Sequence, residues 1–321
     1  MKKILYAVPA AVALVAIAAA VILYPKTVKV TDYAMNTQIT ITAKSRGADR
    51  AVKDAISEVK RIDSLMSPSL STSDICRINS AKANTRVQIS PETYSLIEMS
   101  LQISQKTDGA FDISVNPLIE LWDITSSKPR IPSEGDISKA KSLVNYRDIS
   151  LNSSDKSVLL KKEGMSISLG AVAKGYAADR AVEILRNHGV KEAIVDLGGN
   201  VYVLGDGKRI GIQTPFKKRG EYFKVCTVSD KAVVTCGAYE RYFEENGRIY
   251  HHIFDPNTGY PASSGIKSVT VICANSALAD ALSTALFVSG EERAEQIIAG
   301  FDGAEAIILT DDNRTLNISG N

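Results

Sequence analysis

The spacing of hydrophobic residues divides the chain into extended and helical segments. Residues 27–43 alternate with the two-residue period of a strand, which predicts a strand pair. Residues 50–66 carry apolar side chains at helical spacing, and Ser90-Pro91 supplies the cap and first turn of a helix that runs to about Gln105. The pattern therefore predicts a hairpin followed by two helices.

The rest of the pattern is mixed, without regular alternation of strand and helix. A helix is predicted at 172–187, strand-like runs fill 193–234, a long helix spans 276–288, and a strand follows at 304–309. A glycine stands just beyond each of these two helices, as expected for helix ends. This order predicts an α+β fold with a largely antiparallel sheet and packed helices.

The N-terminus carries a membrane-targeting signal. Two lysines precede an almost wholly apolar stretch, residues 4–24, which matches the roughly 20 residues that a helix needs to cross a bilayer. Ala18-Ala19-Ala20 runs on into more apolar positions and not into a polar cleavage region, which favours an anchor over a cleaved signal peptide. We therefore expect residues 1–26 to anchor the chain in the cell membrane and residues 27–321 to form one extracytoplasmic domain.

Composition excludes several classes of protein. Lys and Arg number 38 against 36 Asp and Glu, so no excess of positive charge points to nucleic acid. The basic run Lys217-Lys218-Arg219 is interpreted as a solvated loop without a role. The four cysteines form no C-x-x-C pair, which argues against a zinc site. Cys226 and Cys236 flank a predicted turn, where a facing pair and two unpaired thiols are equally compatible with the sequence.

Two oxygen-bearing side chains share one face of the helix predicted at 276–288. Asp280 and Thr284 lie one turn apart, so their oxygens project together. Magnesium prefers oxygen ligands and keeps water or phosphate oxygens in its other positions, so a partial protein cage is sufficient. The same pair is also compatible with a solvated Asp and a Thr that bonds to its own helix.

The segment 168–175 passes from a strand through small residues into a helix. A helix N-terminus presents free N–H groups and a partial positive charge, and Lys174 adds a full charge, which together favour a phosphate. The order Ala-Lys-Gly differs from the P-loop, and the glycines at 205, 207 and 211 miss the dinucleotide fingerprint by one residue. Taken alone, this is a weak signal for phosphate binding.

Two of the three histidines, His251 and His252, precede the sequence Asp255-Pro-Asn-Thr-Gly259. That sequence fits a type I turn with Asp first and Pro second, and the turn would fix His252 near its mouth. Adjacent strand residues point to opposite faces, so at most one of the pair serves a site. His188 lies at a predicted helix end, where a structural role is expected. The segment 107–112 is compatible both with a simple turn and with a seat for a planar heterocycle.

Together these segments resemble the ApbE family of FAD:protein FMN transferases. The resemblance implies a T-fold-related antiparallel sheet with packed helices. The matching stretches follow the family's order and cover nearly everything beyond the apolar segment: Met35 to Thr37, Cys76 to Asn79, Thr107 to Asp112, Ser168 to Gly175, Asp196 to Asn200, Gly237 to Phe243, His252 to Gly259 and Asp280 to Phe287.

The resemblance also implies a set of site residues. His252 would serve catalysis, and Mg²⁺ would be held by the carbonyl of Ala171 with the side chains of Asp280, Ser283 and Thr284. FAD contacts would come from Met35, Ala110, Phe111, Asp112, Ser168, Lys174 and Phe254. The chain departs from the family at position 168, usually acidic and here Ser, and at position 236, often Ser and here Cys.

The activity implied by the resemblance is Mg²⁺-dependent transfer of FMN from FAD to a Thr or Ser hydroxyl of an acceptor flavoprotein, with release of AMP. With water in place of the acceptor, the same residues would make an FAD hydrolase that yields FMN and AMP. A protein that only stores FAD is the third interpretation, and it needs neither a metal nor a base. The resemblance suggests acceptors among flavoproteins of membrane or extracellular electron-transfer chains.

Overall fold

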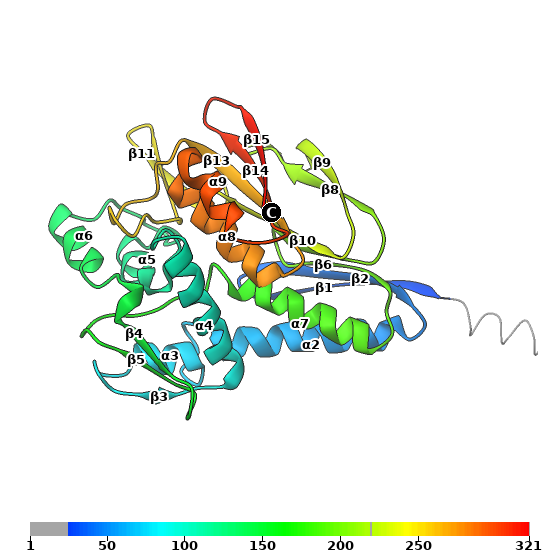
Figure 1. Ribbon diagram of the computed structural model, residues 1–321, viewed down its shortest axis with the longest axis horizontal. Helices are drawn as coiled ribbons and strands as arrows, with labels where there is room; N and C mark the ends of the chain where they lie inside the picture. The colour runs from blue at the N-terminus through cyan, green and yellow to red at the C-terminus, as the bar shows by residue number, and fades with distance from the viewer. Residues whose placement is uncertain (1–24, 219, 321) are drawn as a thin grey trace, which may run out of the picture.

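The computed structural model describes residues 25–218 and 220–320, and nearly all of the predicted anchor at 1–26 lies outside them. Within the described residues, the largest sheet has eight strands, and every neighbouring pair is antiparallel (Figure 1). In spatial order its strands are β1 (Lys26–Ala34), β2 (Thr37–Ser45), β6 (Glu192–Asp196), β7 (Asn200–Leu204), β10 (Lys231–Gly237), β13 (Ile266–Cys273), β14 (Glu305–Thr310) and β15 (Thr315–Ser319). The predicted antiparallel α+β fold is confirmed.

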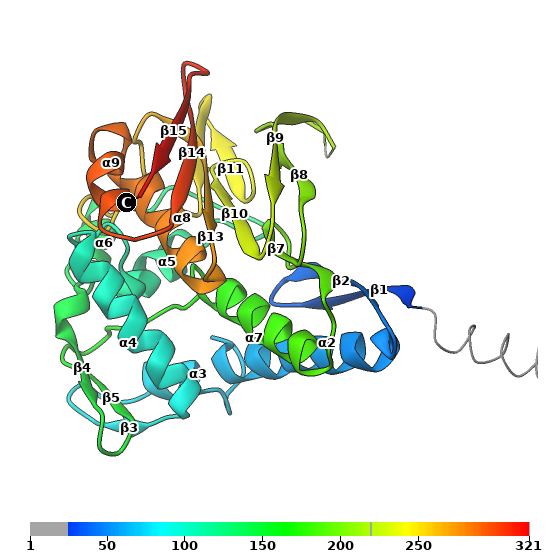
Figure 2. The same cartoon turned by 45° about the vertical axis from the view of Figure 1, so that its right-hand side comes forward.

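Helices cover one face of this sheet. They are α2 (Ala48–Met66), α7 (Ala173–Asn187), α8 (Ser276–Ser289) and α9 (Glu291–Ala299). Helices α2 and α7 lie side by side in both views, and α8 meets α7 (Figures 1 and 2). Alternate strand residues such as Ile39, Ile41 and Val234 join the helices in the main hydrophobic core, as the two-residue period of a strand requires.

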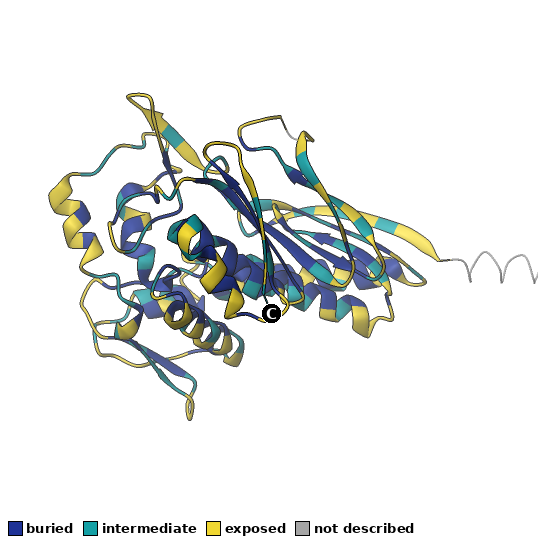
Figure 3. Cartoon of the chain, turned by 45° about the horizontal axis from the view of Figure 1, so that its top comes forward, coloured by how far each residue is buried: buried dark blue, intermediate teal, exposed yellow. Residues whose placement is uncertain are grey.

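A hairpin of β8 (Lys208–Gln213) and β9 (Tyr222–Val228) covers part of the other face. Its residues Ile212 and Val228 pack against Val233 and Ile272 of the sheet. Nearly all residues of β13 are buried, because the helices cover one face of this strand and the β8–β9 hairpin covers the other. Figure 3 shows this burial at the centre of the molecule and exposed residues on its outer turns.

The remaining elements form a smaller region at one end of the sheet. Trp122 is its aromatic centre and packs on Tyr250, Phe254 and Tyr260. Its elements are α3 (Asp74–Asn79), β3 (Val87–Gln88), α4 (Pro91–Lys106), η1 (Ile113–Val115), α5 (Asn116–Trp122), α6 (Glu134–Lys141), η2 (Tyr146–Asp148), β4 (Ile149–Asn152), β5 (Ser157–Leu160), β11 (Tyr242–Glu245) and β12 (Arg248–His251).

The structure shows that Cys226 and Cys236 are two unpaired thiols and not a facing pair. Strand β9 pairs with β8, while β10 pairs with β7 and β13, so the segments that carry Cys226 and Cys236 do not form a hairpin with each other. All four cysteines are free. No helix in the described part of the chain has both the length and the apolar character that spanning a bilayer would take.

Candidate functional site

The site begins where the N-terminal turns of α7 and α8 meet. A Cβ atom on Gly175 would lie 2.2 Å from the carbonyl oxygen of Ser276, so only glycine permits this approach. Asp179, one turn further along α7, accepts hydrogen bonds from the N–H groups of Ser276 and Ala277, each at 2.9 Å. Burial raises the pKa of Asp179 to about 6. These contacts fix the two helix starts against each other.

Asp280 projects from α8 into this junction. Its side chain is buried, and one carboxylate oxygen, Oδ2, accepts from the N–H of Gly175 at 3.0 Å. The other oxygen, Oδ1, lies 3.9 Å from the ammonium of Lys174, which donates to the carbonyl of Gly170 at 3.2 Å. The N-cap residue of α7, Val172, makes no side-chain capping bond, and Asp280 satisfies the N–H of Gly175 in the first turn instead. A carboxylate, a lysine and a helix N-terminus therefore share one place.

Thr284 lies one turn beyond Asp280 and donates its hydroxyl proton to Cys236 Sγ at 3.8 Å, which leaves the oxygen lone pairs available to a cation. Burial raises the pKa of Cys236 to about 12, so this thiol stays protonated at neutral pH. Ser283 is buried, and its hydroxyl donates to the carbonyl of Asp280 at 2.8 Å. Its proton is thus engaged within the helix.

The donors gathered here are oxygens. Asp280 and Thr284 offer a carboxylate and a hydroxyl, and Ala171, whose carbonyl the resemblance implies as a ligand, lies in the loop immediately before α7. Nowhere in the described ranges do three or more His, Cys, Asp or Glu side chains group in a way that could hold a metal ion. Hard oxygen ligands with few protein charges suit magnesium, which completes its shell with water and phosphate oxygens.

His252 follows β12 and is held by the segment between β10 and β11. The carbonyl of Arg241 accepts from the backbone N–H of His252 at 3.2 Å and lies 3.2 Å from Nδ1. A carbonyl only accepts, so Nδ1 carries the proton and Nε2 keeps the basic lone pair. Burial lowers the pKa of His252 to about 4, and the positive charges of Arg241 and Lys174 act in the same direction. The imidazole is therefore neutral at physiological pH.

His251 has a different role. It is buried, its Nε2 lies 3.0 Å from the carbonyl of Ala262, and its Nδ1 accepts from the N–H of Ile253 at 3.3 Å. Its ring also meets Phe287 edge-on at 5.3 Å between centroids. His188 caps the end of α7 and lies 2.9 Å from Asp54. Of the two adjacent histidines, only His252 keeps a ring nitrogen, Nε2, without a hydrogen bond among the described residues.

The turn after His252 differs from the prediction. The N–H of Gly259 donates to the carbonyl of Asp255 at 2.8 Å, which closes a loop one residue wider than the predicted type I turn. The side chain of Asp255 satisfies the N–H of Asn257 at 2.9 Å, and Gly259 supplies a left-handed φ of 80°. Asp and Gly therefore stabilise the wider turn.

The residues predicted to contact the flavin are packed more deeply. Phe111 is 2% exposed within the main core, and Phe254 packs against Trp122 at 6.0 Å between ring centroids. The carboxylate of Asp112 accepts from Ser114 N at 2.7 Å, from Ser114 Oγ at 2.6 Å and from Tyr146 N at 2.9 Å, and burial raises its pKa. Ala110 is also buried. These side chains are occupied by packing and internal hydrogen bonds.

Met35 and Ser168, two further residues predicted to contact FAD, lie in loops. Met35 occupies the β1–β2 turn with a φ of 53° and donates its N–H to Asp63 at 2.9 Å. A Cβ on Gly198 would lie 2.1 Å from Thr37 Oγ1, so this turn abuts the loop before β7. Ser168 Oγ accepts from the N–H of Gly170 at 3.2 Å, immediately before α7.

Two site-forming residues escaped the sequence reasoning. Asp179 follows Gly175 by one helical turn, and that spacing was the available signal. Asn200 is fully buried, its Oδ1 accepts from Ser276 Oγ at 2.8 Å, and its Nδ2 has no hydrogen-bond partner among the described residues. Asn200 stands in one of the stretches that match the family, but its position after two glycines gave it no role beyond that of a turn residue.

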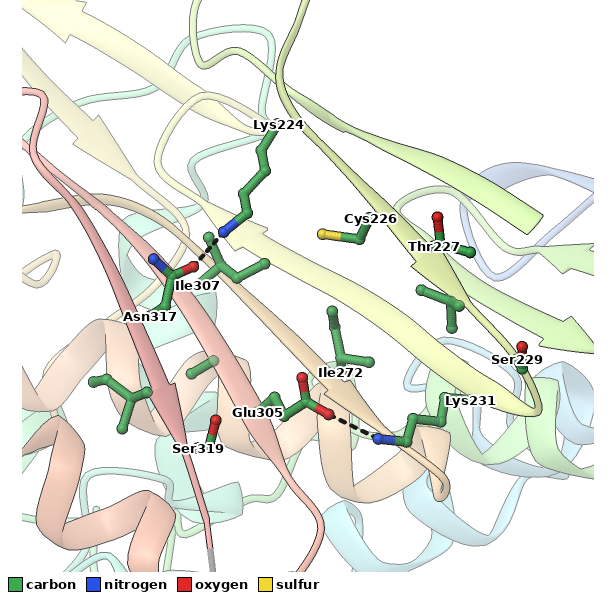
Figure 4. A pocket seen from close by; sticks show the side chains of 13 residues that line it. Lys224, Cys226, Thr227, Ser229, Lys231, Ile272, Glu305, Ile307, Asn317 and Ser319 are labelled. Atoms are coloured by element: carbon green, nitrogen blue, oxygen red, sulfur yellow. Dashed lines mark hydrogen bonds and ion pairs between the residues drawn. The ribbon is translucent and has the colours of Figure 1, made fainter. Parts of the chain in front are cut away.

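Two cavities among the described residues lie elsewhere. One of about 330 Å³ opens between β9 and the sheet strands β13 to β15, with Lys224 and Lys231 on its rim (Figure 4). The other, about 260 Å³, lies between α4, the start of α8 and Phe301 in the turn after α9. Neither is lined by a predicted site residue.

Fold and site together define a class of protein: an antiparallel α+β domain in which a lysine-bearing helix start faces a carboxylate and a hydroxyl on the next helix. The profile of the ApbE family matches residues 35–308. The chain belongs to the ApbE family.

Relatives and solved structures agree with this membership. A protein of Klebsiella pneumoniae named FAD:protein FMN transferase is 36% identical over 81% of this chain and 82% of its own length. A Treponema pallidum protein of the same name is 32% identical over 84% of this chain and 80% of its own length. The crystal structure of an ApbE protein from Thermotoga maritima is 33% identical, covers 91% of this chain and 97% of its own, and has a TM-score of 0.83.

Proposed function

We propose that this protein transfers FMN from FAD to a Thr or Ser hydroxyl of an acceptor flavoprotein and releases AMP, with Mg²⁺ bound at the junction of α7 and α8. The observation that carries the proposal is the convergence of Lys174, Asp280 and Thr284 with a neutral histidine whose Nε2 is uncommitted. The names of the relatives support the same reaction.

Asp280, Thr284 and the carbonyl of Ala171 would hold the magnesium ion, with Ser283 as a further hydroxyl on the same helix. When bound, the ion supplies positive charge that polarises the pyrophosphate and neutralises the leaving AMP. The N–H of Gly175 holds Asp280 by its Oδ2, which leaves Oδ1 for this role. A buried carboxylate with one oxygen committed and one directed to Lys174 fits a cation site.

Lys174 and the start of α7 would bind the pyrophosphate of FAD, because an ammonium and the positive end of a helix dipole both favour an anion. Met35 and Ser168 would contact FAD from the bordering loops. Ala110, Phe111, Asp112 and Phe254 would shape the flavin seat from beneath, since their side chains are buried.

His252 would act as the general base. Its Nε2 takes the proton of the acceptor hydroxyl while that oxygen attacks the FMN phosphorus, the bond from this phosphorus to the bridging oxygen breaks, and AMP leaves with that oxygen. The carbonyl of Arg241 holds the tautomer that this step requires. The products are an FMN phosphoester on the acceptor and AMP, so atoms and charge balance.

The proposal also covers an alternative reaction and the location of the protein. The same residues support hydrolysis of FAD to FMN and AMP when water replaces the acceptor, and this is the alternative activity.

The apolar stretch at 4–24 supports an anchor in the cell membrane, with residues 27–321 on the extracytoplasmic side. Protease digestion of intact cells tests this placement, since a domain inside the cytoplasm would be protected.

The test of the activity is a paired assay. The protein is incubated with FAD and Mg²⁺, with and without an acceptor flavoprotein of an extracytoplasmic electron-transfer chain. AMP release that is coupled to an FMN-sized mass gain on the acceptor supports transfer, and addition of EDTA should stop both. Equal release of AMP and free FMN with or without the acceptor would establish the hydrolase, and bound FAD without AMP would leave a binding protein.

A further inference from the structure

An exposed cluster of aromatic rings lies beside the proposed base. Phe216, in the loop between β8 and β9, meets Tyr239 and Tyr242 edge-on, with ring centroids 6.0 and 5.6 Å away. Phe216 is 45% exposed and Tyr242 is 43% exposed. Neighbouring exposed apolar side chains mark interaction sites more often than isolated ones do. These three rings are called the aromatic patch below.

The patch is connected to His252 through the backbone. Tyr239 and Tyr242 flank Arg241, whose carbonyl binds both the N–H and the ring of His252. Tyr242 is also the register partner of His251 in the β11–β12 hairpin. The hairpin of β8 and β9 packs on β10 through Ile212, Val228 and Val233, and Phe216 in its loop reaches Tyr242 at the start of β11. The patch is therefore contiguous with the segment that orients the base.

The loop that carries Phe216 is held in a defined shape. The side chain of Gln213 donates to the carbonyls of Lys217 and Lys218 at 3.3 and 2.9 Å. Phe216 has a φ of 58°, a left-handed conformation that bulky residues rarely adopt. A ring held in solvent at an unfavourable backbone angle points to a role in binding.

Positive charge borders the patch. Lys217 and Lys218 follow Phe216, both are exposed, and neither ammonium forms an ion pair within the described residues. Glu221 closes the loop through its backbone, and Glu240 lies between the two tyrosines. The two lysines are thus available to an acidic partner.

We propose that the aromatic patch and the two lysines dock the acceptor polypeptide, through an acidic segment that carries the hydroxyl to His252. This inference rests on the proposed transferase function. The acceptor has to reach His252, whereas Lys174 and Asp280 are engaged at the start of α7, so a surface contiguous with Arg241 suits the acceptor and not the pyrophosphate. Complementary charge steers such a partner, and buried aromatic rings supply most of the affinity.

The experiment uses two synthetic peptides as acceptors, each with a single Thr, one flanked by Asp and Glu and the other by Lys and Arg. The protein, FAD and Mg²⁺ are incubated with each peptide, and the FMN adduct is quantified by mass. The wild-type protein is expected to favour the acidic peptide by about tenfold in kcat/KM, and K217E/K218E should reverse that preference. F216S should lower transfer to both peptides by about tenfold and leave the Kd for FAD, read from flavin fluorescence, within about twofold.

The matched control is K53E/K82E, which reverses two exposed lysines on other elements and should leave the peptide preference unchanged. An unchanged preference in K217E/K218E would overturn the proposal, and so would a parallel loss of FAD binding in F216S, which would assign the patch to the flavin. If neither peptide is labelled while the acceptor flavoprotein is, the docking proposal alone is wrong. If the flavoprotein is not labelled either, the proposed function itself is wrong.

Discussion

The junction of α7 and α8 and the segment 107–112 are both expected to bind FAD, yet they are built differently. At the junction, the ammonium of Lys174 lies 3.9 Å from Asp280 Oδ1, which accepts no hydrogen bond from the described residues. In the other segment, Asp112 accepts three hydrogen bonds from the protein, and Phe111 is 2% exposed. The junction therefore has a carboxylate oxygen free to bind a ligand, whereas the polar and aromatic groups of segment 107–112 are committed to contacts within the protein. We infer that the junction supplies the reacting groups and that the segment supports them.

The largest effect is expected at the junction. Replacing Asp280 by Asn removes the charge that would hold Mg²⁺, and the loss of several kcal/mol of transition-state stabilisation corresponds to about a thousandfold lower transfer. D302N, at an exposed carboxylate, is the matched control and should leave the rate unchanged. The measurement is AMP release across a Mg²⁺ titration. A D280N protein with wild-type rates and Mg²⁺ dependence would refute the metal site.

The two adjacent histidines should separate chemistry from structure. H252A is expected to lower transfer by about a hundredfold or more through loss of general-base catalysis, with FAD binding and Tm nearly unchanged. H251A should instead lower Tm, because it removes a buried ring that bonds Ala262 and contacts Phe287. The check is to record rate, FAD affinity and thermal unfolding for both variants. If H252A transferred FMN at the wild-type rate, His252 would not be the general base.

A substitution in segment 107–112 should lower the free energy of unfolding more than it lowers the rate of transfer. F111A opens a cavity in the main core and is expected to cost about 3–5 kcal/mol in the free energy of unfolding. Urea denaturation measures this cost, and the rate per folded molecule should fall far less than in D280N. If F111A kept full stability and lost FAD binding, Phe111 would be a direct flavin contact.

The smallest effect concerns pH. A histidine with an ordinary pKa loses its base form below about pH 6.5. The pKa of His252 is lowered to about 4, so the neutral base persists above that value and is lost only as the pH falls through about 4. Transfer rates between pH 4 and 8 should therefore show no loss near pH 6.5 attributable to this residue. A half-loss near 6.5 that disappears in H252A would contradict the assignment.

Sequence patterns predicted the long elements well. The cap at Ser90 is confirmed by a bond from Thr93 N at 3.2 Å, and α2, α7 and α8 match their predicted ranges closely. The helices α3, α5 and α6 have 6, 7 and 8 residues, which is too short for a clear helical period. Helix α9 was missed because Gly290, a predicted stop, ends α8 and also begins α9.

The site was predictable where its groups lie within one element. Asp280 and Thr284 share a helix face at a spacing that the sequence states directly. The carboxylate of Asp112 accepts from the N–H of Tyr146, 34 residues away, and the turn at Asp255 closes through the N–H of Gly259 and not through that of Thr258. Long-range contacts, and the choice between two turns that differ by one residue, are set by the fold and not by the local pattern.

The central claim is that the junction of α7 and α8 binds the metal and the pyrophosphate. The most direct test is a crystal structure with FAD and Mn²⁺ as an anomalous stand-in for Mg²⁺. The account predicts a metal peak bonded to Asp280 Oδ1, Thr284 Oγ1 and the carbonyl of Ala171, with FAD phosphate oxygens completing its shell and Lys174 beside them. A metal peak or a pyrophosphate located away from this junction would contradict it.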